Sequence, residues 1–304
     1  MSKPNVYKLH GLNIQSEIPL PASPTNEHPD IIVSAQKLPK SLPDLIDNRK
    51  NLQFDGKKIL INQPLFGSLL IEKNTAIKHE FYPNLSQAHC ITAILGSGIG
   101  TLLHLNGNTP LHGLAVSGQQ GAVILLADSG TGKSTLATAL LLAGQTVFTD
   151  DIIALRYDAK GQLNVQPAHK RFKLEPAQLS NMHVNIDKLC TTAPGVNKLG
   201  WDIPTQLFAQ QAQPLKKCLF ISTTRAAGQQ ASIASISQFE SFTRLRQHIY
   251  RPRLMNVLKQ QETFFQLNTT LQNQCCSYTI NLPELTSFES IKEYGVALSE
   301  QLGL

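Results

Sequence analysis

The feature that most constrains the fold is the continuous segment GAVILLADSGTGKSTLATALLLAGQTVFTDDIIAL, which runs from Gly121 to Leu155. It begins with a short apolar run of the kind that forms a buried strand. The glycine-rich ADSGTGKST follows, and then a series of good helix formers from Ser134 to Ala143, after which Gly144 is a helix stop signal. A strand, a tight loop and a helix in this order indicate an α/β domain.

The glycine-rich loop matches the pattern G-x-x-x-x-G-K-[ST] except at its first position, which is alanine. In such loops the backbone N–H groups and the helix N-terminus attract phosphate oxygens. The lysine reaches the β- and γ-phosphates, the following hydroxyl ligates Mg²⁺, and we expect this lysine to be exposed at the loop. The predicted nucleotide site therefore consists of Ala127, Asp128, Ser129, Gly130, Thr131, Gly132, Lys133, Ser134 and Thr135.

An acidic pair, Asp150 and Asp151, follows the predicted helix. A helix of this length rises about 15 Å, and the returning segment from Gln145 to Asp150 spans up to about 20 Å. The pair should therefore lie level with the loop, in a crossover unit with parallel strands. Beside a phosphate, one carboxylate is explained by a Mg²⁺ ion shared with Ser134 and the other by a substrate hydroxyl that loses its proton. The alternative is one metal-facing aspartate beside an inert neighbour, and the sequence does not assign the roles.

The segment from PLHGLAVS through the acidic pair resembles the HPr serine kinase/phosphorylase family, and more closely its shorter HPr-kinase-related relatives, several of which phosphorylate ribosomally made peptides. His112 in an HG turn, the loop and the acidic pair carry the resemblance. It implies a catalytic domain of P-loop type related to phosphoenolpyruvate carboxykinase, with ATP and Mg²⁺ as cofactors. It also implies catalytic roles for His112, Lys133, Asp150 and Asp151.

One stretch departs from the bifunctional members of that family. They carry Glu-Ile-Arg-Gly-Leu-Gly after the acidic pair, and its Glu helps to bind metal. Here QPAHKRFKLEP stands in that region, with His169, Lys170, Arg171 and Lys173 and no third carboxylate before Glu175. The difference argues against a phosphorylase reaction and against HPr as the acceptor. The basic residues would instead hold an acidic or already phosphorylated acceptor.

Two domains are predicted. Residues 1–107 read as a small β-rich domain that ends in a helix, because short β-branched runs alternate with prolines and with an Asp55-Gly56 hairpin signal. In the helix, Gly96, Gly98 and Gly100 indicate close packing. His10 is expected at the surface of this domain, together with Lys8 and Glu17. Residues 108–304 read as the P-loop catalytic domain of the HPr kinase type.

Basic residues away from the loop are candidates for binding substrate. Arg251 ends a predicted helix in RLRQHIYRPR, and Lys198 lies in the Pro- and Gly-containing loop TTAPGVNKLGWDIP, which can close over a substrate. With Arg171 these form the predicted substrate set. A solvated helix face is the alternative for the arginines.

Composition limits the classes of ligand and partner that we expect for this chain. The 304 residues carry a formal net charge of +6, which fits an anionic ligand, but no long basic block indicates nucleic acid. Five cysteines without metal-ligand spacing, and a first segment without a signal-like apolar core, favour a cytoplasmic protein without a membrane anchor. A homo-oligomer remains open.

Together these features predict an ATP- and Mg²⁺-dependent kinase that phosphorylates a hydroxyl, favouring a serine of a protein or peptide. A small-molecule kinase would use the same residues. A nucleotide-dependent switch or assembly module would use the acidic pair only for metal.

Overall fold

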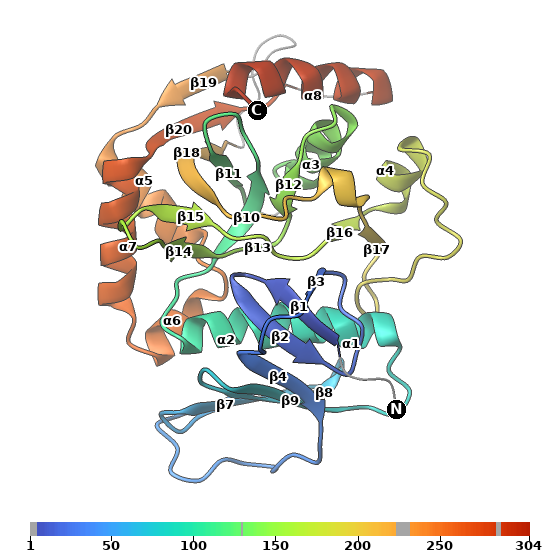
Figure 1. The fold of residues 1–304 in the computed structure, drawn as a ribbon, viewed down its shortest axis with the longest axis vertical. Coiled ribbons are helices and arrows are strands. Elements are labelled where there is room, and N and C mark those ends of the chain that lie inside the picture. The colour runs from blue at the N-terminus through green and yellow to red at the C-terminus, as the bar shows by residue number, and fades with distance from the viewer. Residues whose placement is uncertain (1–4, 129, 223–231, 284–286) are drawn as a thin grey trace.

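The computed structural model describes residues 5–128, 130–222, 232–283 and 287–304. It is a mixed α/β structure with two large sheets, one in the N-terminal part and one in the C-terminal part, and a two-stranded ribbon beside them (Figure 1).

The N-terminal sheet has the strand order β3-β1-β2-β4-β9-β8-β7-β6-β5. Its strands are β1 (Asn5–Leu9), β2 (Leu12–Ser16), β3 (Ser23–Thr25), β4 (Ile31–Ala35), β5 (Asp47–Arg49), β6 (Leu52–Phe54), β7 (Lys58–Gln63), β8 (Gly67–Glu72) and β9 (Ala76–Phe81). The predicted turn at Asp55-Gly56 is confirmed: Gly56 has a φ of +96° and joins two antiparallel strands. The Asp55 carboxylate accepts the backbone N–H of Lys58 at 2.7 Å, which fixes the turn.

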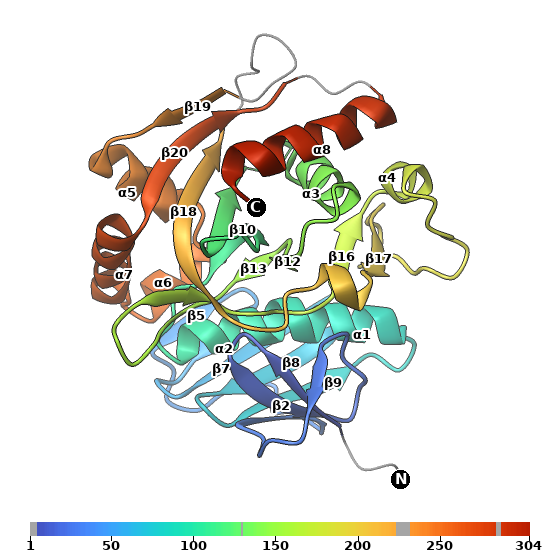
Figure 2. The ribbon, with the colours of Figure 1, turned by 45° about the horizontal axis from the view of Figure 1, so that its top comes forward.

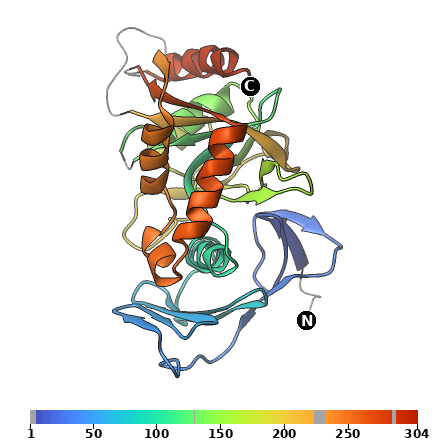
Figure 3. The ribbon, with the colours of Figure 1, turned by 90° about the vertical axis from the view of Figure 1, so that its left-hand side faces the viewer.

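One long helical segment lies between this sheet and the C-terminal part (Figure 3). It consists of α1 (Gln87–Ala93), a π-helical turn η1 (Ile94–Gly98) and α2 (Ile99–Leu105). The predicted close packing at its glycines is confirmed, because a Cβ on Gly100 would lie 2.3 Å from Cε1 of Tyr250. The segment is long and apolar enough to cross a membrane, but 72% of its most apolar stretch is buried inside the protein. It is therefore a core helix of this fold.

The C-terminal sheet has the order β12-β10-β11-β18-β15-β14, with β13 on β10, and β20 between β18 and β19. Its strands are β10 (Leu111–Val116), β11 (Ala122–Leu126), β12 (Val147–Thr149), β13 (Ile152–Ile153), β14 (Leu155–Tyr157), β15 (Leu163–Val165), β18 (Gln213–Ile221), β19 (Ser232–Ser235) and β20 (Cys276–Asn281). Strand β10 pairs antiparallel with both β11 and β12. Strands β11 and β12 therefore run parallel, as predicted, but with β10 inserted between them.

Helices cover both faces of this sheet (Figure 2). Their bounds are α3 (Lys133–Leu142), α4 (Pro176–Asn181), η2 (Thr205–Leu207), α5 (Gln238–Gln247), α6 (Pro252–Val257), α7 (Gln261–Gln274) and α8 (Phe288–Leu302). Val123 and Leu125 of β11 pack in the core beneath α3 and α8. Ile124 and Leu126 pack in the core beneath α5 and α7. Because both faces are buried, β11 reads as a continuous apolar run.

The remaining strands, β16 (Arg171–Leu174) and β17 (Leu199–Asp202), form the antiparallel ribbon. Phe172 and Leu174 are fully buried in the core that contains α3, so they hold the ribbon against the C-terminal sheet. The other face of β16 is left free for Arg171 and Lys173. This placement brings a segment far along the chain next to the acidic pair.

The predicted boundary at 107/108 falls in the link between α2 and β10. An apolar core nevertheless continues across it: Ile152 and Leu254 belong to the same cluster as Ile94 and Ile99 of the helical segment. The turn between β1 and β2 also reaches the C-terminal part, where the backbone N–H of His10 donates to the Pro167 carbonyl at 2.6 Å. The two parts are therefore packed closely around the helical segment.

Candidate active site

The chain turns sharply between β11 and α3, where the sequence predicts the phosphate loop. Gly130 and Gly132 have φ angles of +84° and +105°, in the region of backbone space that favours glycine. Thr131 stabilises the turn by donating its hydroxyl to the Asp128 carbonyl at 2.8 Å. The first backbone N–H groups of any helix lack a partner within the helix, so those at the start of α3 are suited to receive an anion at the loop. The local geometry is that of an anion-binding helix start.

A cavity of about 450 Å³ opens beside this turn. The predicted loop residues that line it are Asp128, Gly130, Gly132, Lys133, Ser134 and Thr135. Ala127 lies instead in the apolar core under α3, with 1% of its surface exposed. Thr131 is buried and turned toward the loop itself, and Ser129 lies outside the described residues.

The acidic pair lies in the short break between β12 and β13, opposite β10. Strand β10 pairs with β12 through Ala115 and with β13 through His112, so the break is held from one side. Lys133 donates to the Asp150 carbonyl at 3.1 Å, which places the pair level with the start of α3. The length argument from the sequence is confirmed in this respect.

The two carboxylates have different surroundings. Asp150 accepts the backbone N–H of Lys173 at 3.0 Å through Oδ2, whereas its Oδ1 is buried without a hydrogen-bond partner among the described residues. Burial, followed by the charge of Asp151, raises the pKa of the Asp150 carboxyl. Burial also disfavours ionisation of Asp151, but Lys173 and His112 outweigh it and hold the pKa of that carboxyl well below its ordinary value. Asp151 is therefore a firmly ionised carboxylate, and Asp150 carries an unused oxygen.

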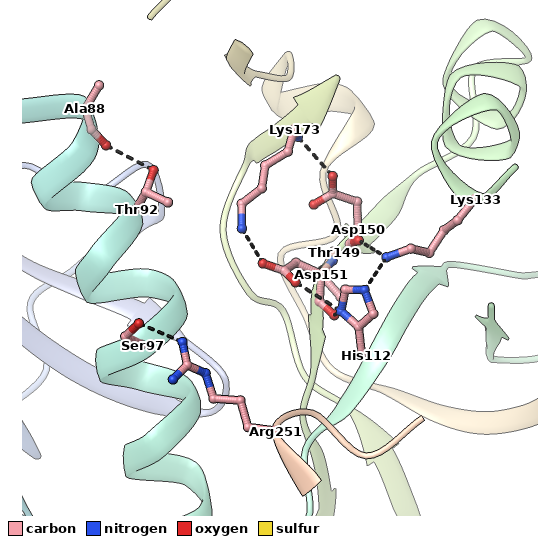
Figure 4. Close-up of polar contacts among 10 residues, drawn as sticks. All are labelled: Ala88, Thr92, Ser97, His112, Lys133, Thr149, Asp150, Asp151, Lys173 and Arg251. Carbon is pink, nitrogen blue, oxygen red and sulfur yellow. Dashed lines mark hydrogen bonds and ion pairs between the residues drawn. The ribbon is translucent and has the colours of Figure 1, made fainter. Parts of the chain in front are cut away.

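His112 connects the loop to Asp151 (Figure 4). Its Nδ1 lies 3.1 Å from the carbonyl oxygen and 3.1 Å from Oδ1 of Asp151, and its Nε2 lies 3.0 Å from Nζ of Lys133. The Lys133 ammonium has only protons to donate, so Nε2 must accept and Nδ1 must carry the imidazole proton. The His112 ring thus links Lys133 to Asp151 through a continuous series of polar contacts.

Lys133 is partly buried, so the expectation that it would be exposed at the loop is wrong. It folds back over the acidic pair instead of extending into solvent. Burial lowers the pKa of its ammonium, while Asp150 and Asp151 act in the opposite direction. A cation held in this way gains most from an incoming anion such as a phosphate.

Lys173 is the site residue whose position the sequence did not reveal. Its Nζ lies 2.5 Å from Oδ2 of Asp151. Burial opposes its charge, but Asp151 more than compensates and raises the pKa of the Lys173 ammonium. The sequence showed that Lys173 lies in a basic stretch, in the region where the resemblance implies a metal-binding residue. It did not show the ion pair with Asp151, because that contact forms only when the chain folds.

The three predicted substrate residues lie in three places. Lys198 lines the cavity and donates to Oγ of Ser134 at 3.2 Å. Arg171 lies outside this cavity and forms a bidentate pair with Asp202, at 2.7 and 2.9 Å. Arg251 donates to Oγ of Ser97 in η1 at 2.7 Å. It therefore joins α6 to the helical segment, and it does not line the cavity.

The donor set fits a nucleotide with Mg²⁺. Asp150 and Ser134 line one cavity, and Mg²⁺ prefers carboxylate and hydroxyl oxygens of this kind. Oδ1 of Asp150 is buried and has no hydrogen-bond partner among the described residues, so it is available to a cation that enters the site. Mg²⁺ is commonly held by one or two carboxylates plus substrate phosphates. The described ranges contain no group of three or more His, Cys, Asp or Glu side chains placed to hold a metal by themselves.

No family model matches the chain, and no curated protein matches it in sequence. Among solved structures, the Hpr(Ser) kinase/phosphatase from Coxiella burnetii is similar over 64% of this chain and 96% of its own, at 10% sequence identity and a TM-score of 0.31. The relationship is distant. At these values the likeness carries no argument about activity, and the function has to be argued from the geometry of the site.

His10 was expected at the surface, and this expectation is wrong. The residue is fully buried, and both of its ring nitrogens lack hydrogen-bond partners among the residues described. Burial lowers its pKa to about 4, although the charge of Asp151 acts against this. His169, also buried, has its pKa lowered to about 3 by burial and by His10. The imidazoles of His10 and His169 are therefore uncharged at neutral pH, and both are close enough to Asp151 for its charge to act on them.

Proposed function

We propose that this protein is an ATP- and Mg²⁺-dependent kinase that transfers the γ-phosphoryl group to a hydroxyl, a serine in a protein or peptide. The supporting observation is the polar chain Lys133–His112–Asp151–Lys173, which joins a phosphate-binding loop to an ionised carboxylate within hydrogen-bond distances. A site that only bound nucleotide would not need a second carboxylate held ionised by two partners.

The loop would hold the triphosphate. The positive φ angles of Gly130 and Gly132 and the start of α3 support this, because backbone N–H groups at such a turn and helix N-terminus would face phosphate oxygens. Lys133 would exchange its contact with the Asp150 carbonyl for the β- and γ-phosphates. Lys198 would leave Ser134 in the same step, which frees the serine hydroxyl. These movements are side-chain rotations, so the backbone of the site is already arranged.

Asp150 and Ser134 would hold Mg²⁺ together with phosphate oxygens. When bound, the ion neutralises charge on the β- and γ-phosphates. Asp150 suits this position because the residue lines the loop cavity and its buried Oδ1 lacks a partner among the described residues. Its raised pKa also means that a nearby cation would favour its ionised form.

Asp151 would take the proton of the acceptor hydroxyl. Its carboxylate lies on the side of the acidic pair that faces α1 and η1, whereas the Asp150 carboxylate points toward the backbone of Lys173 and the Asp150 carbonyl toward Lys133 (Figure 4). The acceptor oxygen forms a bond to the γ-phosphorus, and the bond from that phosphorus to the bridging oxygen breaks. ADP departs with the electron pair, and the proton moves to Asp151. Lys173 and His112 keep the carboxylate ionised and oriented beforehand.

Incubation with γ-labelled ATP, Mg²⁺ and serine-containing peptides tests this function. We expect label on a peptide serine, located by mass spectrometry, and none with Asp151→Asn. Label on a small molecule alone would support the small-molecule alternative. Release of free phosphate, with no acceptor labelled in a peptide mixture or a lysate, would contradict the proposal. Lys292→Ala, an exposed change on α8, is the matched control and should label as the unmodified protein does.

The reverse reaction is a separate test. Inorganic phosphate and the phosphorylated product should give no pyrophosphate, because residues 166–174 carry basic side chains and no carboxylate in the region where the resemblance implies an additional acidic side chain. Formation of pyrophosphate would contradict this part of the proposal.

A further inference from the structure

A second cavity, of about 320 Å³, lies next to the predicted catalytic residues. Ala88 and Thr92 of α1 form one wall of it. Arg171 and Asp202 of the β16–β17 ribbon line it from the C-terminal part, and Lys188 lies on its rim. It is therefore a cleft between the N-terminal helix and the ribbon, and the phosphate loop does not contribute to it.

The second cavity and the active-site cavity are lined by neighbouring residues of the ribbon, Arg171 and Lys173, which lie on one face of β16. In the register of β16 and β17, Arg171 is opposite Asp202 and Lys173 is opposite Gly200. Alternate residues of a strand point to one face, about 6.6 Å apart. Arg171 lines the second cavity, and Lys173 lines the first and contacts Asp151. An extended peptide covers this distance with two residues, so it could place one side chain in the second cavity and another beside Asp151.

The helix presents small side chains to the second cavity. Ala88 and Thr92 line it, and Thr92 donates its hydroxyl to the Ala88 carbonyl at 3.0 Å (Figure 4). Neither side chain is large enough to block an extended backbone. The N-terminal part of the chain thus supplies one wall of the acceptor path.

The charged side chains that line the second cavity carry a net positive charge. Arg171 is compensated by Asp202. Lys188, which is exposed, has no carboxylate within 4.0 Å in the described part of the chain. Its charge is complementary to an acidic ligand and repels a basic one.

We infer that the second cavity binds an acidic side chain of an extended peptide, two to three residues from the hydroxyl that reaches Asp151. This inference rests on the proposed kinase function for the role of that hydroxyl, but binding itself does not require turnover. The N-terminal part then contributes to the choice of peptide, because α1 forms one wall of the cavity.

Trp201 provides a direct readout, because it is the chain's single tryptophan and it lines the second cavity. We would titrate the protein, without ATP, with a blocked heptapeptide that has a central serine flanked by glutamates. We expect a saturable change in Trp201 emission, and binding at least about fivefold weaker for the peptide with glutamines in place of glutamates. Equal binding of the two peptides would overturn the acidic specificity, and no response to either would overturn the site.

Lys188→Glu sharpens the test. It should weaken the glutamate peptide by roughly fivefold to tenfold and improve a lysine-flanked peptide, a reversal that misfolding cannot produce. In phosphotransfer the same variant should raise KM for the glutamate peptide and leave kcat and KM for ATP unchanged. Lys292→Glu carries the same charge change on α8 and should alter neither peptide.

The two proposals fail differently. Peptide phosphorylation without a Trp201 response would overturn the second cavity and leave the kinase function standing. A Trp201 response in a protein that transfers no phosphate would retain the binding site and overturn the kinase. An equal Trp201 response to an oligonucleotide would show general anion binding and would also overturn the peptide site.

Discussion

Two ion pairs, one beside each large sheet, differ in how far water reaches them. Beside the N-terminal sheet, Lys8 and Glu27 are 3.4 Å apart, with 51% and 58% of their side chains exposed. On the C-terminal side, Lys173 and Asp151 are 2.5 Å apart, with 28% and 12% exposed. Water can replace either partner in the first pair, but not in the second.

The difference in exposure between the two ion pairs indicates where charged groups are held at a cost to the stability of the fold. Surface pairs contribute little to stability, and removing one member leaves a hydrated charge. Buried charges carry a desolvation cost that only their partners offset. Asp150 goes further, because one buried oxygen has no partner among the described residues. Clusters of perturbed groups of this kind are characteristic of functional sites.

The largest expected effect comes from breaking the buried pair. Asp151→Asn leaves the Lys173 ammonium buried without its carboxylate, so we expect the free energy of unfolding to fall by about 3–5 kcal/mol. Urea denaturation measures it. Glu27→Gln on the N-terminal sheet is the control and should cost less than about 1 kcal/mol. Equal losses for the two variants would remove the contrast between the sheets.

Lys133→Ala tests function at the same site with less effect on the fold. Lys133 contacts an imidazole nitrogen and a carbonyl, so its loss leaves no carboxylate stranded within ion-pair distance. We expect turnover to fall by roughly 100- to 1000-fold, as for loss of one positioned electrostatic group. Phosphotransfer kinetics and a melting curve would be measured together. Lys58→Ala, on the N-terminal sheet, should leave turnover unchanged; full activity in Lys133→Ala would disprove the role of the loop.

Asp150→Asn separates the two carboxylates. Because the pKa of Asp150 is raised in the folded protein, its ionised form opposes folding at neutral pH, and the amide should be as stable as the original or more so. Mg²⁺-dependent nucleotide affinity should fall by at least about tenfold, the lower end for damage to a metal site. Calorimetric titration with and without Mg²⁺ measures this. Normal Mg²⁺-dependent affinity would show that Asp150 does not face the metal.

The last prediction concerns His10 and pH. An unfolded histidine has a pKa of about 6.5, whereas burial lowers that of His10 to about 4. As the pH falls from 6.5 toward 4, the unfolded chain binds a proton that the folded chain does not, so stability is lost on acidification. His10→Asn suits the left-handed backbone, with φ of 54°, and removes this titration.

We expect a flatter dependence of Tm on pH between 6.5 and 4 in His10→Asn, with the other histidines whose pKa burial lowers, His79, His104, His169 and His248, contributing to the remaining slope. His28→Asn, at an exposed position of the same N-terminal part, should retain the original dependence. An unchanged curve for His10→Asn would mean that the buried imidazole does not control stability in this range.

The sequence was informative where function depends on contiguous residues. The strand, the turn at Gly130 and Gly132, and the helix are set by local pattern, and the position of Asp150 follows from helix and strand lengths. His112 came from the resemblance, and the structure brings it to Lys133 and Asp151. Their catalytic roles remain predictions.

The remainder depends on contacts between distant segments. Lys173 reaches Asp151 only because Phe172 and Leu174 anchor β16 in the core. His10 is buried because the turn between β1 and β2 enters the C-terminal part, although by its neighbours in sequence it is an ordinary turn residue. Helix α7 was missed for a related reason: most of QETFFQLNTTLQNQ is polar, and its apolar face is sparse.

The fit between Gly100 and Tyr250 has a genetic consequence. A methyl group at position 100 would collide with the Tyr250 ring, whose centre lies 6.2 Å from that of His112. A single nucleotide change in the codon for a buried glycine of the N-terminal helix would therefore displace an aromatic side chain beside the active site. A screen for inactive mutants should therefore recover substitutions of Gly100 together with substitutions of the predicted catalytic residues, although glycine has no side chain that could react.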